Sequence, residues 1–271
     1  MTKNMLDLGI VELEDILAGM KSLNKTGEET PNVEKLQKRL ERSIELLKQY
    51  KFLQPDELTG LPSNKASERF FIQGFRDAQE SYKTGQDYRN DEARYANFSV
   101  MIIDIDDFTK FNDRHGHDIG DRVLKVVGQK LEYSTKSTDI VFKDYHNYDV
   151  ARDGGEEFVV VLPNTNIDKA RIVANRLVRE MSRNKIDGKY EVTISCGTTS
   201  RKIDLEEELT DEMIKEELYL PLKRQADNAL YAAKNNGKNR FEEFNPEIDY
   251  ATIRQQYNAK KSGNKQSNKP A

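Results

Sequence analysis

Three acidic side chains surround a pair of glycines in the stretch ARDGGEEFVVV, residues 151–161. Asp153, Glu156 and Glu157 repel one another there unless they are solvated or face a positive charge. We expect Gly154 and Gly155 to be the central residues of a hairpin turn, because a primed turn needs positive φ at both positions. A solvated surface turn is one interpretation of the stretch, and a site for a strongly positive ligand is the other.

A second acidic cluster favours the interpretation of the glycine hairpin as a site for a positive ligand. The apolar run FSVMIID is typical of a buried strand and leads directly into Asp104, Asp106 and Asp107. Carboxylates at the end of a buried strand are costly unless they are solvated or paired with a cation. Asp104 beside the glycine hairpin would form an oxygen-rich magnesium site, and two such ions stabilise in-line displacement at phosphorus. Alternatively, Asp106 and Asp107 cap the next helix.

Further residues have the chemistry to bind a nucleotide. Guanine offers N1–H and N2–H₂ as paired donors, which the carboxylate of Asp121 would accept, beside the donor and acceptor of Asn112. The alternative for Asp121 is an N-cap of the following helix. Lys234 and Lys238 are spaced one helical turn apart near a helix end, where they would hold phosphates or simply complement the helix dipole.

The composition restricts the class of protein. The 271 residues are 36% hydrophobic and 33% charged with a net charge of −4, which gives no reason to expect nucleic acid or an anionic membrane as partner. Cys196 is the only cysteine, so no internal disulfide forms and a reducing setting fits. We find no secretory signal and no apolar run long enough to span a bilayer, and we expect a cytoplasmic protein.

The N-terminal residues, 1–54, read as two helices separated by NKTGEETPN. The first covers about 5–24. In the second, Val33, Leu40 and Leu47 repeat every seven residues, with charged residues between them. This pattern predicts a short coiled coil that dimerises the chain, or a helix packed on its own domain.

Strands alternate with helices over residues 55–246, which indicates a layered α/β or α+β domain. The expected strands are FSVMIID, DIVFK, EFVVVLP, YEVTISCG and RFEEF. The fourth of these is expected to stop at its glycine. The acidic stretch 202–217 is expected to be a solvated helix or loop. We expect residues 247–271 to be a disordered tail, because this segment contains few apolar residues.

Five motifs occur in an order that closely resembles the GGDEF family of diguanylate cyclases, over about residues 56–245. They are DELTGL, IDIDDFTKFNDRHGHDIGD, GGEEF, VTISCG and ADNALYAAKNNGKNR. The resemblance implies a palm-like α+β fold, with a central, mainly antiparallel sheet flanked by helices and preceded by the N-terminal helices. It implies condensation of two GTP into cyclic di-GMP, with release of pyrophosphate.

The resemblance also implies a site for Mg²⁺ or Mn²⁺, with two ions. Asp104, the carbonyl of Ile105 and Glu157 would bind metal. Glu156 would act at the reacting hydroxyl or at the second ion, and the division of roles between the two glutamates stays open. One domain binds one GTP, so two domains must face each other. The N-terminal helices would then control a homodimer.

The implied GTP site has a base pocket and a phosphate part. Asn112, Asp121 and His117 would surround guanine. The phosphate part would contain Phe108, Gly154, Gly155, Lys234 and Lys238. In it, the phenylalanine would pack beside the triphosphate, the glycines would let the backbone approach it, and the lysines would hold its β- and γ-phosphates.

The sequence departs from the family pattern in several places. Thr109 stands where a lysine is frequent, Lys238 replaces an arginine, and PSNKA lacks the usual Asn-Arg order. Many members carry Arg-x-x-Asp in a product-inhibition site, whereas the nearest match here is Lys136 to Asp139, followed by an insertion around 140–152. Lysine cannot make the bidentate contact of arginine. We therefore expect weak or absent feedback inhibition.

Two alternatives compete with an active cyclase. The first is a catalytically silent GGDEF domain that binds GTP or cyclic di-GMP as an interaction module. The intact acidic residues of GGEEF and Asp104 argue against it. The second is a cyclase for another purine nucleotide, which the carboxylate of Asp121 disfavours.

Overall fold

The structure is a computed structural model that describes residues 13, 15–18, 40, 55–84, 94–136 and 149–266. The chain separates into two compact units, 1–54 and 55–271. Most of the first unit, and with it the predicted coiled coil, lies outside the described residues, as does the expected strand DIVFK.

The second unit contains a five-stranded sheet in the order β2-β3-β1-β4-β5. The strands are β1 (Tyr95–Ile105), β2 (Asp149–Gly154), β3 (Glu157–Leu162), β4 (Ile194–Asp204) and β5 (Phe241–Glu243). Neighbouring strands are antiparallel except β4 and β5, which are parallel. The predicted α+β class with a mainly antiparallel sheet is confirmed.

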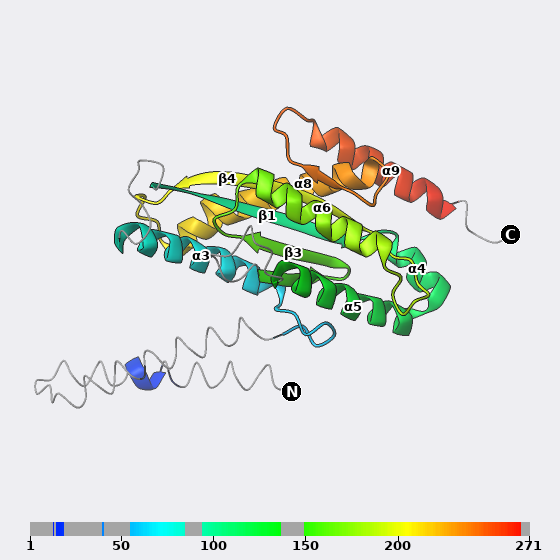
Figure 1. Ribbon diagram of the computed structural model, residues 1–271, viewed down its shortest axis with the longest axis horizontal. Coiled ribbons are helices and arrows are strands. Elements are labelled where there is room, and N and C mark those ends of the chain that lie inside the picture. The colour runs from blue at the N-terminus through cyan, green and yellow to red at the C-terminus, as the bar shows by residue number, and fades with distance from the viewer. Residues whose placement is uncertain are drawn as a thin grey trace, which may run out of the picture. The chain divides into compact units, whose positions relative to one another are not determined.

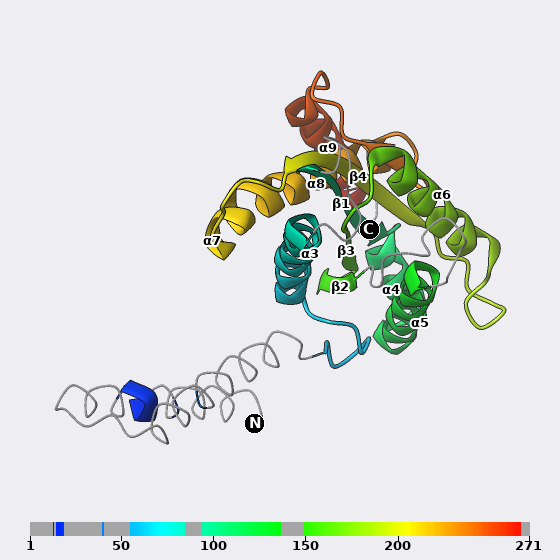
Figure 2. The same cartoon turned by 60° about the vertical axis from the view of Figure 1, so that its left-hand side comes forward.

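Helices cover both faces of this sheet (Figures 1 and 2). They are α3 (Asn64–Thr84), α4 (Phe108–His115), α5 (His117–Lys136), α6 (Ile167–Arg183), α7 (Asp211–Met213), the π-helix η3 (Ile214–Tyr219), α8 (Leu220–Asn235) and α9 (Tyr250–Gln266).

Alternate residues of β1 enter two separate hydrophobic cores. Met101, Ile103 and Ile105 pack with residues of α5 and α6. Val100 and Ile102 pack with residues of α3, η3 and α8 on the opposite face. Because both faces are covered, the central strands are almost continuously apolar, which is the pattern that made them recognisable.

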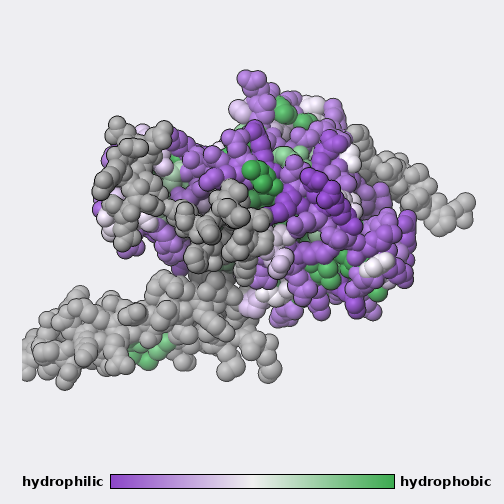
Figure 3. Space-filling model, in the orientation of Figure 1, coloured by the Kyte–Doolittle hydropathy of each residue, from purple (hydrophilic) through white to green (hydrophobic). Residues whose placement is uncertain are grey.

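The outer surface is strongly polar. Figure 3 shows a mostly hydrophilic face, with hydrophobic residues in small separate groups. Ile172 on α6 and Tyr133 on α5 are among the exposed large hydrophobic residues. Within the described ranges, charged side chains therefore lie mainly on the solvent-facing sides of helices whose inner sides fill the two cores. None of the helices within the described ranges is long and apolar enough to cross a membrane.

Strand β4 does not stop at its glycine, as expected, but continues through Gly197 to Asp204. A Cβ atom at Gly197 would lie 2.0 Å from the carbonyl oxygen of Ala226 and 2.1 Å from the amide nitrogen of Leu230. This glycine therefore allows α8 to pack directly on the strand, and it does not mark a break.

The acidic stretch 202–217 is only partly the solvated helix or loop that we expected. Its first residues complete β4, and Ile203, Leu205 and Ile214 are buried in the core that contains α3 and α8. The glutamates around these apolar anchors are exposed. Spaced single apolar residues in an acidic segment thus fix it to the domain.

The expectation of a disordered tail at 247–271 is wrong for most of that segment. Residues Tyr250–Gln266 form α9, which packs against α8 (Figure 1). Tyr250 is 7% exposed, and its ring stacks on Phe244 with centroids 5.2 Å apart. Aromatic and arginine contacts hold this helix, so a count of aliphatic residues underestimated its burial.

Candidate active site

The two acidic clusters meet at the end of β1. Asp104 is paired directly with Glu157 in the antiparallel register of β1 and β3. The residue Asp104 is only 5% exposed. The neighbouring amide of Ile105 donates to the carbonyl of Glu156, with 3.3 Å between the atoms. Directly opposite residues of antiparallel strands place their side chains on the same face. The carboxylates of Asp104 and Glu157 therefore share one face of the sheet.

The glycine hairpin differs by one residue from the predicted turn. Gly154 pairs with Glu157 as the last residue of β2, so Gly155 and Glu156 lie in the turn. A register shift between Arg152 and Gly154 displaces the turn. Both glycines have positive φ, 141° and 52°. The backbone of the hairpin therefore carries no side chains at Gly154 and Gly155, next to the end of β1 that contains Asp104.

Two ion pairs hold this hairpin. The guanidinium of Arg152 donates to Asp56 Oδ1 at 2.8 Å and to the carbonyl of Gly155 at 2.7 Å. The ammonium of Lys223 on α8 pairs with Asp153 at 2.6 Å. One of the three crowded acids is therefore neutralised from outside the hairpin, which leaves Glu156 and Glu157 for a ligand. Sequence reasoning missed these partners, since they come from distant parts of the chain.

Asp104 and Glu157 lie in an environment that disfavours their charge. Burial raises the pKa of Asp104 to about 6, with the nearby Glu156 and Glu157 adding to the rise and Lys234 opposing it. Burial also raises the pKa of Glu157. Lys234 Nζ lies 2.6 Å from Asp104 Oδ2, and its side chain is 12% exposed. A single ammonium group thus acts on the carboxylates of both Asp104 and Glu157.

This donor set fits a divalent cation. Within the described ranges, no three His, Cys, Asp or Glu side chains are already arranged as a metal-binding group. Magnesium, however, prefers few carboxylates together with water and phosphate oxygens. Asp104 and Glu157 supply hard oxygen donors, and their raised pKa values show a local need for positive charge.

The base-reading candidates come from α4 and α5. The amide oxygen Oδ1 of Asn112 is buried and, among the described residues, has no hydrogen-bond partner. It lies so close to Gly120 that a Cβ there would be 1.9 Å away. Asp121 is exposed inside α5, whose first residue is the exposed His117, so the N-cap alternative is wrong. A buried acceptor without a donor suits a ligand that carries an N–H group.

Phe108 is the first residue of α4. The residue is 6% exposed and packs in the core on the side of α5 and α6, and its predicted contact with the triphosphate stays a prediction. Asp107 occupies the N-cap position of α4 with φ of 53°, but its side chain makes no capping hydrogen bond. It pairs with Lys110 at 2.8 Å and Lys238 at 2.6 Å instead.

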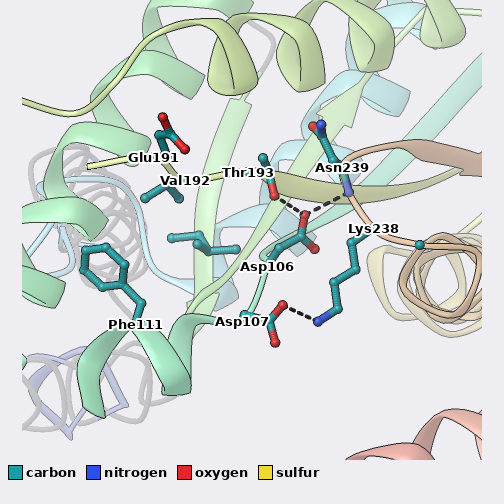
Figure 4. A pocket seen from close by; sticks show the side chains of 10 residues that line it. Asp106, Asp107, Phe111, Glu191, Val192, Thr193, Lys238 and Asn239 are labelled. Carbon is teal, nitrogen blue, oxygen red and sulfur yellow. Dashed lines mark hydrogen bonds and ion pairs between the residues drawn. The ribbon is translucent and has the colours of Figure 1, made fainter. Parts of the chain in front are cut away.

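A cavity of about 270 Å³ lies around the loop that follows Asp104 (Figure 4). Asp106 braces it by accepting from Thr193 Oγ1 at 2.7 Å, Ser195 Oγ at 2.6 Å and the amide of Asn239 at 2.9 Å. The lining includes Lys238 but not Lys234, so the cavity contains only part of the predicted phosphate site. It is lined by Ile105, Asp106, Asp107, Phe111, Glu191, Val192, Thr193, Gly237, Lys238 and Asn239.

The two candidate phosphate lysines are not on one helix. Lys234 belongs to α8, which ends at Asn235, whereas Lys238 follows Gly237 in a left-handed conformation with φ of 63°. The glycine has φ of 113°, so the chain turns away from the helix axis there. Lys136 is the last residue of α5, and Asp139 lies outside the described residues. The proposed degenerate inhibitory pair therefore stays a prediction.

Relatives with similar sequences carry a common description. Diguanylate cyclase A of Treponema denticola is 38% identical over 145 residues, which cover 52% of this chain and 34% of that protein. Diguanylate cyclase DgcM of Escherichia coli K12 is 35% identical over 143 residues, covering 53% of this chain and 30% of that protein. The chain thus spans about a third of the length of these curated relatives.

Solved structures give the same result. The GGDEF domain of TpbB, or YfiN, from Pseudomonas aeruginosa is 26% identical with a TM-score of 0.53, covering 74% of this chain and 99% of that one. The GGDEF domain of DgcB from Caulobacter crescentus, solved in complex with c-di-GMP, is 25% identical with a TM-score of 0.50. The match covers 70% of this chain and 92% of that one. The sequence profile described as "Diguanylate cyclase, GGDEF domain" matches residues 53–240. The chain belongs to the GGDEF family of diguanylate cyclases.

Proposed function

We propose that this protein condenses two molecules of GTP into cyclic di-GMP and two pyrophosphates. The observation that carries the proposal is the pairing of Asp104 with Glu157, beside a hairpin whose two glycines have positive φ. The relatives named as diguanylate cyclases support the same reaction class.

The proposed substrate site divides into three parts. Asn112 and Asp121 read guanine, and the unpartnered Oδ1 of Asn112 supports this role. The exposed glycine backbone admits the phosphates. Lys234 and Lys238 hold the outer phosphates, for which each must exchange its present carboxylate partner for phosphate oxygens.

In the proposed reaction, the 3′-hydroxyl of one GTP attacks the α-phosphorus of the other. A phosphorus–oxygen bond forms to this hydroxyl as the bond to pyrophosphate breaks, and the hydroxyl proton is lost. The reciprocal attack closes the ring. Asp104, the Ile105 carbonyl and Glu157 would hold Mg²⁺ or Mn²⁺, which would supply positive charge and lower the pKa of the hydroxyl. Glu156, in the turn, acts at that hydroxyl or at a second ion.

Two copies of the chain are needed in this scheme, because each domain supplies one GTP. We assign residues 1–54 to holding the copies together, on the heptad spacing of Val33, Leu40 and Leu47. The effective concentration of the two domains then sets the rate.

Incubation with Mg²⁺ and GTP, followed by detection of cyclic di-GMP by mass, tests the proposal. Glu157→Gln should reduce turnover by at least about 100-fold without lowering the melting temperature. Glu208→Gln, at an exposed acid, should retain full activity. GTP binding without product in the wild-type protein would favour the silent binding module. An equimolar mixture of ATP and GTP should give only the guanine product.

Feedback inhibition is a separate part of the proposal. Lys136 is a point charge where a bidentate arginine is frequent, so product should bind poorly at that position. Initial rates should stay within about two-fold in the presence of micromolar cyclic di-GMP. Strong inhibition at that concentration would contradict this expectation without affecting the cyclase assignment.

A further inference from the structure

Helix α9 is fixed to α8 by residues on one of its sides. Arg254 pairs with Asp227, donates to Asn228 Oδ1 at 3.1 Å, and lies over the ring of Tyr231 at 4.2 Å. Tyr250 anchors the start of the helix, where its hydroxyl accepts from the amide of Asn245 at 2.9 Å. Arg254 and Tyr257 follow Tyr250 by four and seven residues, so all three lie on the same side of the helix.

Tyr257 reaches from this side toward the acidic site. Its ring meets Tyr231 edge-on with centroids 5.5 Å apart, and Lys234 Nζ lies 5.9 Å from its centroid. The same ammonium is 2.6 Å from Asp104. Burial raises the pKa of the Tyr257 hydroxyl, Lys234 lowers it, and both Asp104 and Asp107 raise it, which places the ring within electrostatic reach of both acids.

We propose that Tyr257 is a positioning residue that holds the Lys234 ammonium at the phosphate-binding edge, and that α9 forms the outer wall of that site. The inference rests on the proposed binding of GTP phosphates by Lys234. It adds a residue outside 53–240, the range matched by the family profile.

The physical basis is the freedom of a lysine side chain. Its four-carbon stem loses considerable rotamer entropy when its ammonium must stay at one place. An aromatic face attracts the ammonium and excludes water around it without consuming any of its three N–H donors. Lys234 can therefore change its partner from Asp104 to a phosphate while it remains beside the ring.

We assign the positioning of Lys234 to the aromatic ring of Tyr257 and not to its hydroxyl group. The test variants are therefore chosen to separate these two parts of the side chain. Tyr257→Phe retains the aromatic face, whereas Tyr257→Leu retains apolar bulk without it. Gln255→Ala changes an exposed residue of the same helix and serves as the control. Arg254→Gln weakens the attachment of α9 to Asp227 and leaves Tyr257 itself unchanged.

The test measures equilibrium binding of guanosine 5′-[α,β-methylene]triphosphate, which cannot release pyrophosphate, and of GMP, which lacks the outer phosphates. Tyr257→Leu should raise the Kd for the triphosphate about five-fold, and Arg254→Gln should raise it in the same direction. Binding of GMP should not change. Tyr257→Phe and Gln255→Ala should match the wild-type protein.

The outcomes separate this inference from the proposed function. If the wild-type protein binds the triphosphate and Tyr257→Leu binds it equally well, the role of Tyr257 is wrong and the cyclase assignment stands. Equal losses in the Leu and Phe variants, or an equal loss of GMP binding, would also overturn the role. Failure of the wild-type protein to bind the triphosphate would overturn both.

Discussion

At the scale of single residues, the site is a balance between one ammonium and several carboxylates. Attraction to Asp104 and Glu157 outweighs the burial of Lys234, which alone would lower its pKa, so the net shift is upward. The pKa of Asp104 rises despite this partner, because burial and two neighbouring glutamates act against its charge. Without a cation, the acids therefore destabilise the fold that positions them.

This balance predicts a pH dependence of stability in a chelator. The pKa of Asp104 is about 6 in the folded protein and near 3.8 ordinarily, so the unfolded chain loses its proton first as the pH rises. The Asp104 contribution to the free energy of unfolding should fall between pH 4 and 6, by about 3 kcal/mol in total.

Urea unfolding of the wild-type protein and Asp104→Asn in EDTA measures this contribution. The difference in unfolding free energy, wild type minus variant, should decline from pH 4 to pH 6 and be flat above about pH 7. Lys234 stays charged over that range and adds only a constant offset. A difference that does not depend on pH would mean that Asp104 is solvated and ionises normally.

At the scale of elements, the hairpin is held by contacts that join distant segments. Arg152 on β2 reaches Asp56, at the start of the second unit, and the carbonyl of Gly155 in the turn. The side chain of Arg152 is 13% exposed and that of Asp56 26%. A change at the start of the domain is therefore connected to the glycine turn by one side chain.

Arg152→Met should lower the unfolding free energy by about 2 kcal/mol, because it leaves a partly buried carboxylate and the Gly155 carbonyl without their donor. Asp56→Asn should cost less, since the amide oxygen still accepts. In a double-mutant cycle the two changes should couple by about 1 kcal/mol. Additive effects would show that the pair contributes nothing beyond its separate parts.

The contact between β4 and α8 gives a second prediction at this scale. Gly197→Ala places a methyl group against the backbone of α8, at 2.0 Å from Ala226 O, and backbone cannot move aside cheaply. The unfolding free energy should fall by about 4 kcal/mol. Gly128→Ala is the control, because its Cβ would meet side-chain atoms and no backbone, Leu61 Cδ1 at 3.1 Å and Thr59 Cβ at 3.4 Å, and alanine favours the helix. Chemical denaturation compares the two variants.

At the scale of the whole molecule, the sequence predicted what local patterns determine. The apolar runs of β1 and β3 and the acids at their ends were sufficient to expect that Asp104 meets the glycine hairpin. The one-residue shift of the turn, the continuation of β4 through Gly197 and the place of Lys238 depend on tertiary packing, which a local pattern does not contain.

Helix α9 shows the same limit more clearly. Tyr250, Arg254 and Tyr257 have the spacing of one helix face, and this signal was present in the sequence. It was outweighed by the polar composition of the segment, because arginine and tyrosine bury through ring stacking and ion pairs that hydropathy does not measure.

The last prediction concerns the assembly that the reaction requires. If two domains each supply one GTP, turnover per chain should rise with protein concentration until the dimer saturates. Replacing Leu40 and Leu47 by Asp puts charges on the heptad positions, so the half-saturation concentration should rise at least about ten-fold while the plateau activity is retained. Lys38→Ala, between the heptad positions Val33 and Leu40, is the control. Turnover that is independent of concentration in every variant, in chains that sediment as monomers, would remove the need for a facing partner and would return residues 1–54 to the alternative of a helix packed on its own domain.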